Sequence, residues 1–92
     1  MSQDQDIEPG KLSFPCQIGI KAMGRQSEVF PDSVKEIIAM HVEEDALVEV
    51  RIRSSKAGKY LSVTCEVRLD NRDQMEAIYA AMHEHPDILM TL

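Results

Sequence analysis

The sequence predicts an α+β fold of the ferredoxin-like type, with the element order βαββαβ. Four segments alternate apolar and polar residues, as strands with one buried face do. Two intervening segments carry apolar residues at helical spacing instead. Because each strand has a polar face, both helices must cover the same side of one four-stranded antiparallel sheet. Right-handed crossovers then give the strand order 4-1-3-2, with the third strand inside the sheet.

Size and composition predict a single cytoplasmic domain. The chain has 92 residues, 43% hydrophobic residues and a formal net charge of -6. An acidic chain of this length lacks the clustered Lys and Arg that nucleic acid and anionic membranes require, so we expect neither partner. There is no apolar run of membrane-spanning length, and the acidic N-terminus lacks the apolar centre of a signal peptide. Two cysteines without CxxC spacing are typical of the reducing cytosol.

The predicted domain covers residues 14–92, and residues 1–13 are expected to form a flexible acidic tail. The tail shows no periodicity and contains Asp4, Asp6 and Glu8. An acidic docking peptide is the alternative interpretation of this segment.

The first strand and first helix are expected on either side of a loop at 24–27. Pro15 has no N–H to donate, so it suits the start of a strand over 14–24. Ser33 and Glu36 have the spacing of a capping box, which predicts the start of the helix.

The second and third strands are expected over 47–53 and 60–69, as a hairpin joined by the turn 54–59. In the second strand, Val48, Val50 and Ile52 are expected to face the core. The third strand alternates most cleanly, with five inner residues: Leu61, Val63, Cys65, Val67 and Leu69.

A second helix is expected after residue 70, with a cap formed by Asn71 and Gln74. Pro86 cannot continue a helix, so the helix must end before it. The alternating residues 88–92 then form the last strand.

Several dispersed segments resemble the YbeD-like family of small uncharacterised bacterial proteins. They are Phe14-Pro15-Cys16, Ile20-Lys21, Met23-Gly24, Ser54-Ser55-Lys56, Gly58, Tyr60, Ser62-Val63, Ile78-Tyr79 and His85-Pro86. The resemblance spans about residues 14–92 and implies an ACT-like ferredoxin fold, akin to amino-acid-sensing regulatory domains. It implies no catalytic residues. It implies a regulatory role, with a suggested link to lipoate metabolism.

The hairpin turn and the strand after it form the predicted ligand site. Hydroxyl groups, two Lys side chains and a Gly can hold an anion such as phosphate or carboxylate. A merely solvated turn with Gly at positive φ is the alternative. The predicted ligand-binding residues are Ser54, Ser55, Lys56, Gly58, Tyr60 and Ser62.

The polar face of the sheet offers a second candidate surface. Arg51 and Arg53 are predicted to dock an acidic partner protein, and a solvated face with cross-strand ion pairs is the alternative. An RNA-binding sheet of this topology needs stacking aromatic residues in its central strands. This face has only Tyr60, at a strand end.

Neither a metal nor a cofactor is expected. His83 and His85 are two residues apart and would point in different directions on a helix. Cys16 and Cys65 fall on inner strand faces, where a free thiol behaves as a small apolar group. No zinc-binding spacing is present among the His and Cys residues.

We therefore expect a non-enzymatic regulatory or adaptor domain that binds a small ligand or a partner protein. A monomer or weak homodimer is expected, since an edge strand can pair with another chain. The alternative is a small phosphate-handling enzyme of acylphosphatase-like topology, with Arg25 in the phosphate loop. That alternative lacks the glycine-rich loop spacing and an Asn on the second strand.

Overall fold

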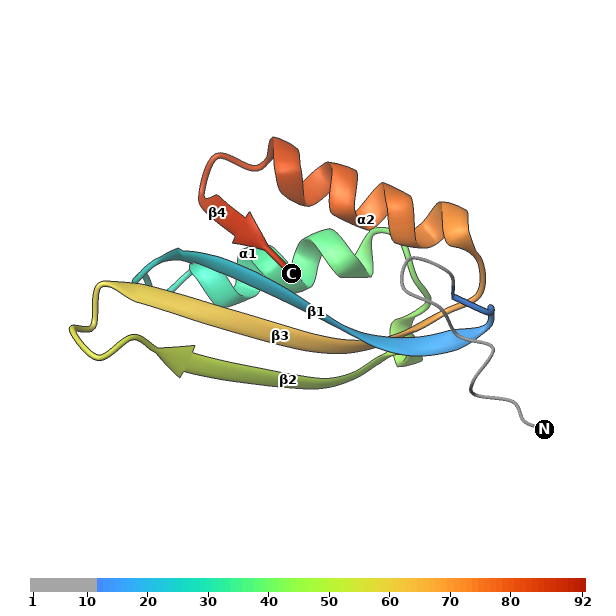
Figure 1. Cartoon of the computed structure of the whole chain (residues 1–92), viewed down its shortest axis with the longest axis horizontal. Helices are drawn as coiled ribbons and strands as arrows, with labels where there is room; N and C mark the ends of the chain where they lie inside the picture. Colours follow the sequence, from blue (N-terminus) through green and yellow to red (C-terminus); the bar gives the residue numbers. More distant parts are fainter. Residues whose placement is uncertain (1–11) are drawn as a thin grey trace.

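The computed structural model describes residues 12–92, so most of the tail predicted over 1–13 lies outside the described residues. The elements are β1 (Cys16–Arg25), α1 (Phe30–Ala39), the 3₁₀ turn η2 (Glu44–Ala46), β2 (Leu47–Ser54), β3 (Tyr60–Leu69), α2 (Arg72–Glu84) and β4 (Ile88–Thr91). The strands form one antiparallel sheet in the order β2-β3-β1-β4. Both helices lie on one face of it (Figure 1). The predicted βαββαβ fold and strand order are confirmed.

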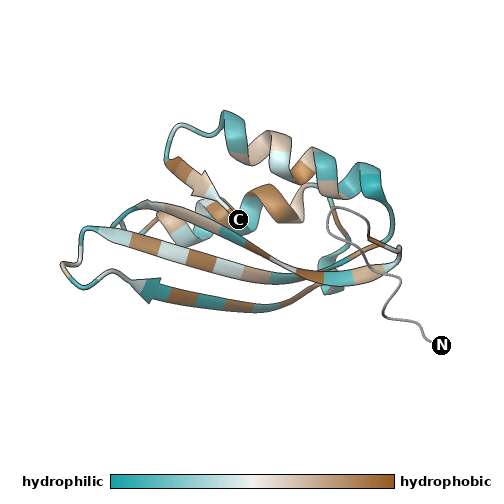
Figure 2. Ribbon diagram, viewed as in Figure 1, coloured by the Kyte–Doolittle hydropathy of each residue, from teal (hydrophilic) through white to brown (hydrophobic). Residues whose placement is uncertain are grey.

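The central strand β3 supplies the middle of the core. Its five predicted inner residues are all buried, at 0–5% exposure, and its outer residues are more exposed. Figure 2 shows the resulting alternation of apolar and polar bands along the strand. The other fully buried side chains come from β1, α1 and α2, and they are Ile20, Ala22, Val34, Ile38, Ile78 and Met82.

The start of α1 differs from the prediction. The helix begins at Phe30, and the predicted capping box between Ser33 and Glu36 is wrong. The Ser27 hydroxyl oxygen instead accepts hydrogen bonds from the backbone N–H groups of Val29 (3.2 Å) and Phe30 (3.0 Å). Ser33 lies inside the helix, and its hydroxyl donates to the Val29 carbonyl oxygen.

The start of α2 agrees with the prediction. The Asn71 side-chain oxygen accepts a hydrogen bond from the Gln74 backbone N–H, at 2.9 Å. The Gln74 side-chain oxygen accepts in return from the backbone N–H of Asp70, at 2.7 Å. These reciprocal bonds satisfy N–H groups that a helix start otherwise leaves unpaired.

The edge strand β2 contains an irregularity that changes which side chain faces the core. Leu47 is opposite Val67 while Glu49 is opposite Glu66, so the register shifts at Val48. Leu47 therefore packs against the core, and Val48 is 50% exposed. The prediction that Val48 faces the core is wrong. A bulge places one extra residue in β2, so the side chains before the bulge point to the opposite faces from those that strict alternation predicts.

Residues 12–92 include no helix that is both long and apolar enough to cross a membrane. The described chain is elongated, with extents of 45 × 27 × 22 Å. Figure 1 shows the β2–β3 hairpin extending beyond the end of the helical layer. Ile52, near the end of β2, is consequently 53% exposed although it was predicted to be buried.

Candidate ligand site on the open sheet face

The sheet face opposite the helices carries its outward side chains in rows that run across the strands. The strand register defines two adjacent rows across the sheet, the second of which ends at Leu92, the residue that follows β4 and exchanges backbone hydrogen bonds with Lys21. From β2 to β4, the first contains Arg53, Ser62, Met23 and Met90, and the second contains Arg51, Thr64, Lys21 and Leu92. We refer to them as the Arg53 row and the Arg51 row. Basic, hydroxyl-bearing and apolar side chains thus share one surface.

Two adjoining cavities lie over these rows. One, of about 420 Å³, is lined by Lys21, Arg51, Ile52, Arg53, Ser62 and Thr64. The other, of about 220 Å³, is lined by Lys21, Met23, Arg53, Ser54, Ser55, Tyr60 and Ser62. They share Lys21, Arg53 and Ser62, so we treat them as one site, the open-face hollow. The short Ser and Thr side chains of β3 form its floor.

The three cations of the open-face hollow differ in their partners. Arg51 pairs with Glu66 at 3.0 Å and with Glu49 at 3.3 Å. Hydrogen bonds to Glu66 and then Glu49 raise the pKa of Arg51 above its usual value. Lys21 and Arg53 form no salt bridge with any residue of 12–92. These two side chains therefore offer the least compensated positive charge in the hollow.

The predicted ligand residues of the hairpin divide into two groups. Ser54, Ser55, Tyr60 and Ser62 all line the open-face hollow. Lys56 and Gly58 lie at the exposed tip of the hairpin and do not line it. Of the predicted docking residues, Arg53 faces the hollow without a carboxylate partner in the described part of the chain, and Arg51 is ion-paired.

Some polar groups of the hairpin already form hydrogen bonds within the protein. The Ser55 hydroxyl accepts from the Tyr60 backbone N–H at 3.2 Å, and the Gly58 N–H donates to the Ser55 carbonyl oxygen at 3.0 Å. Gly58 has a φ of 73°, as expected for a glycine at this point of a turn. The Ser54 hydroxyl contacts the Gln26 side-chain oxygen at 3.4 Å. The hydroxyls of Ser62 and Tyr60 form no side-chain hydrogen bond with any residue of 12–92.

Sequence reasoning did not assign Lys21 and Met23 to the site. Alternation placed both residues near the sheet, and Lys21 on its polar face. Their position beside Arg53 depends on the pairing of Lys21 with Thr64 and of Met23 with Ser62. No local sequence signal specifies that register, because the paired strands are some forty residues apart in the chain.

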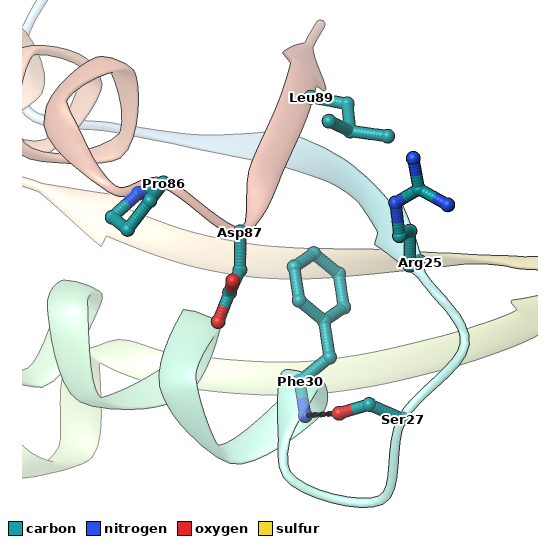
Figure 3. Close-up of a pocket in the computed structure, with 6 residues that line it drawn as sticks. All are labelled: Arg25, Ser27, Phe30, Pro86, Asp87 and Leu89. Atoms are coloured by element: carbon teal, nitrogen blue, oxygen red, sulfur yellow. Dashed lines mark hydrogen bonds between the residues drawn. The ribbon is translucent and has the colours of Figure 1, made fainter.

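A separate cavity of about 150 Å³ lies where β1, α1 and β4 meet, and its lining includes Arg25 and Asp87 (Figure 3). In that view the Phe30 ring lies between the Arg25 guanidinium and the Asp87 carboxylate. The first N–H groups of α1 donate to Ser27, as described above. A phosphate at this helix start would have to displace the Ser27 hydroxyl and approach a carboxylate.

The thiols and imidazoles are dispersed. Cys65 is opposite Ile20 and Cys16 is opposite Leu69, so the two free thiols are not cross-strand neighbours. Burial raises the pKa of the Cys65 thiol to about 11. In residues 12–92, no group of three His, Cys, Asp or Glu side chains is arranged to hold a metal ion.

Comparison with known proteins places the chain in a family. The model of a family described as "Protein of unknown function (DUF493)" matches residues 10–92. The chain belongs to this family. The similar UPF0250 protein of Nitrosomonas europaea is 34% identical over 85 residues, which cover 92% of this chain and 98% of the relative. A UPF0250 protein of Pseudomonas aeruginosa is 35% identical over 80 residues, which cover 86% of each chain.

Solved structures confirm the ACT-like ferredoxin fold. A solution structure of a Helicobacter pylori protein has a TM-score of 0.71 at 15% identity, and the match covers 100% of this chain and 94% of that one. The ACT domain from the GTP pyrophosphokinase of Chlorobium tepidum has a TM-score of 0.65 at 9% identity, with 84% and 83% covered. At these identities the likeness shows the fold alone. The resemblance to the YbeD-like family and to ACT domains is confirmed.

Proposed function

We propose that this chain is a non-catalytic regulatory or adaptor domain whose open-face hollow binds an anionic group of a small ligand or partner protein. One observation carries the proposal: Lys21 and Arg53 line the same hollow without a carboxylate partner in residues 12–92. In a chain with a net charge of -6, such a local concentration of positive charge attracts anions to one place.

The chemistry of the hollow suits a carboxylate or a phosphate. The Arg53 guanidinium can donate two parallel hydrogen bonds to either group, and Lys21 adds a compact charge. The hydroxyls of Ser62 and Thr64 lie on the floor as further donors. The ACT-like fold supports a regulatory role by analogy with the Chlorobium domain, which belongs to a larger enzyme.

The biological setting belongs to the same proposal. We place the protein in the cytoplasm because its two cysteines are free and unpaired. A role in lipoate metabolism is supported by the family resemblance alone. Nucleic acids and anionic membranes are disfavoured as partners by the net negative charge. We propose that the protein is a monomer or a weak homodimer.

Phosphate-handling catalysis is less favoured by the geometry around Arg25. The Ser27 hydroxyl occupies the N–H groups at the start of α1, and Asp87 lines the same cavity. Both features oppose an anion at that position. We expect no release of phosphate when the protein is incubated with acetyl phosphate.

A titration with citrate and with pyrophosphate tests the proposed function, with backbone amide NMR shifts as the readout. We expect shifts along β1 and β3 at Lys21, Ser62 and their neighbours. Arg53→Gln and Lys21→Gln should each weaken binding by about five-fold or more, which corresponds to roughly 1 kcal/mol.

Arg68→Gln is the matched control for this titration. Arg68 lies on the same sheet face but pairs with Asp45 at 3.2 Å and does not line the hollow. The control should bind the anions like the unmodified protein. Equal affinities for Arg53→Gln, Lys21→Gln and the unmodified protein would overturn the proposed function.

A further inference from the structure

The apolar end of the open sheet face is not accounted for by anion binding. Met90 and Leu92 are 53% and 65% exposed, and Met23, beside Met90, is half-buried. Met90 ends the Arg53 row and Leu92 ends the Arg51 row, whereas Met23 of β1 precedes Met90 in the Arg53 row. An isolated exposed apolar residue is ordinary. A group of them beside Lys21 and Arg53, which have no carboxylate partner within 12–92, is typical of a surface that binds a partner.

From this arrangement we infer that the open sheet face docks an amphipathic α-helix of a partner protein, with its acidic flank on the β2 side and its apolar stripe on the β4 side. The inference rests on the proposed function and names its partner class. Lys21 and Arg53 would receive the acidic side chains. Met23, Met90 and Leu92 would pack against the apolar stripe.

The dimensions of the face suit a helix. Adjacent strands lie about 4.8 Å apart, so the distance from β2 to β4 across the four-stranded sheet is about 14 Å. An α-helix with its side chains is about 10–12 Å wide. Ser62 and Thr64 have short side chains in the middle of both rows, which lets a helix approach the sheet between the longer flanking residues.

The charges of neighbouring residues also limit how far the site extends along the strands. Beyond the Arg51 row, Glu49 is opposite Glu66, and Glu66 is opposite Gly19. These two carboxylates would repel acidic side chains that extended in that direction. At the other end, toward the hairpin, Tyr60 lines the hollow and is opposite Arg25 in the sheet, so no carboxylate of the paired strands lies there. An acidic helix is therefore favoured over the end of the sheet nearest the hairpin.

A partner helix is favoured over a small molecule because the hollow is shallow. Sites for small molecules usually bury most of the ligand surface in a cleft. The open-face hollow has a floor of short side chains from β3 and no covering element from α1 or α2, which lie on the opposite face. Laying an amphipathic helix on such a surface buries its apolar stripe and leaves its polar side in water.

Three synthetic peptides of about 15 residues, a length at which isolated helices begin to form, test the inference. The first combines a Leu stripe at helical spacing with flanking Glu residues. The second keeps the stripe but has Lys in place of Glu. The third keeps the Glu residues but has Gln in place of Leu. Fluorescence anisotropy of the labelled peptides gives the affinities for the full chain.

We expect the first peptide to bind at least about ten-fold more tightly than either of the others, since both classes of anchor contribute. Arg53→Gln and Met90→Gln should each weaken its binding. Arg68→Gln and Met40→Gln are the matched controls and should not. Met40 is 79% exposed at the end of α1, away from this face.

The outcomes separate the inference from the proposed function. If the first and third peptides bind equally and Arg53→Gln weakens both, the proposed anion site is supported. The inference of a docked amphipathic helix is then overturned, because the Leu stripe contributes nothing. NMR shifts confined to the backbone amides of β2 would instead indicate strand addition at the sheet edge, which also overturns it. Failure of all acidic peptides together with citrate and pyrophosphate would overturn both.

Discussion

Gly24 lies directly against the ring of Phe30. A Cβ atom on Gly24 would be 2.4 Å from the Phe30 Cε1 atom and 2.5 Å from the carbonyl oxygen of Asp87. The glycine therefore lets the end of β1, the first residue of α1 and the segment leading into β4 converge. The ring is 2% exposed, and it also lines the cavity of about 150 Å³ that Arg25 and Asp87 line.

Gly24→Ala should lower the free energy of unfolding by about 2–3 kcal/mol, because the added methyl group would overlap both the Phe30 ring and a backbone carbonyl oxygen, and the backbone atom cannot move without shifting the chain. Urea unfolding monitored by circular dichroism measures the change. Gly19→Ala is the control: its Cβ would meet the Glu66 Oε2 atom at 3.0 Å, and this carboxylate is the far end of a flexible side chain. Similar losses for both variants would contradict the assignment.

Ser27→Ala should destabilise the protein by about 1 kcal/mol, the usual contribution of a helix-capping hydroxyl. The Val29 and Phe30 N–H groups would lose their acceptor. Ser33→Ala should have a smaller effect, since Ser33 is an interior helical residue and Ala favours the helix. Thermal unfolding of the two variants compares them. A larger loss for Ser33→Ala would restore the capping box that the sequence predicts.

Cys65 should make the protein less stable at alkaline pH. Its thiol pKa is raised by burial from 9.0 to about 11. Below pH 9 both folded and unfolded chains keep the proton, and between about pH 9 and 11 only the unfolded chain loses it. Stability therefore falls as pH rises through this window. The full loss is about 3 kcal/mol, because the two pKa values differ by about two units and each unit corresponds to about 1.4 kcal/mol.

Urea unfolding at several pH values from 8 to 11 should show a shallower decline for Cys65→Ala than for Cys16→Ala. Removal of the buried side chain lowers stability at every pH, so the slope is the quantity to compare. Burial also raises the pKa of Tyr79, which leaves a residual decline of the same sign in both variants. Parallel slopes for the two cysteine variants would show that Cys65 does not carry the effect.

Glu66→Gln should strengthen the binding of citrate by a few-fold. The substitution removes the nearer partner of Arg51, at 3.0 Å, and leaves Glu49 as its one remaining carboxylate partner in residues 12–92. The guanidinium can then donate more of its hydrogen bonds to an anion in the hollow. Asp45→Asn removes the same charge from the Arg68 pair, away from the hollow, and should change the affinity less. Isothermal titration calorimetry measures both. An unchanged affinity for Glu66→Gln would mean that Arg51 takes no part in binding.

Local patterns predicted the features that depend on neighbouring residues. The inner face of β3 follows from strict alternation, and the α2 cap follows from the spacing of Asn71 and Gln74. The start of α1 was placed too late because Pro31 and Ser33 resemble a helix start. Pro31 instead occupies the second helical position, where a missing N–H costs nothing, and Ser27 provides the cap from outside the helix.

Features that depend on register were not predictable in the same way. The bulge at Val48 depends on how β2 pairs with β3. No residue within β2 indicates that the register shifts there. The candidate site shows the same division. Arg53 and Ser62 were identified from their own strands, whereas Lys21 joins them only through the pairing of β1 with β3. Met90 joins them through a further pairing with β1.

Because buried and exposed residues alternate along β3, substitutions in this strand fall into two classes with different effects. Its odd-numbered residues from Leu61 to Leu69 form the core, and its even-numbered residues from Tyr60 to Arg68 form the open face. Substitutions at the even positions can therefore change the chemistry of the open face while the folded framework is preserved. Substitutions at the odd positions alter stability and leave the chemistry of the exposed surface unchanged. The surface chemistry and the stability of the fold can therefore change almost independently within a single ten-residue strand.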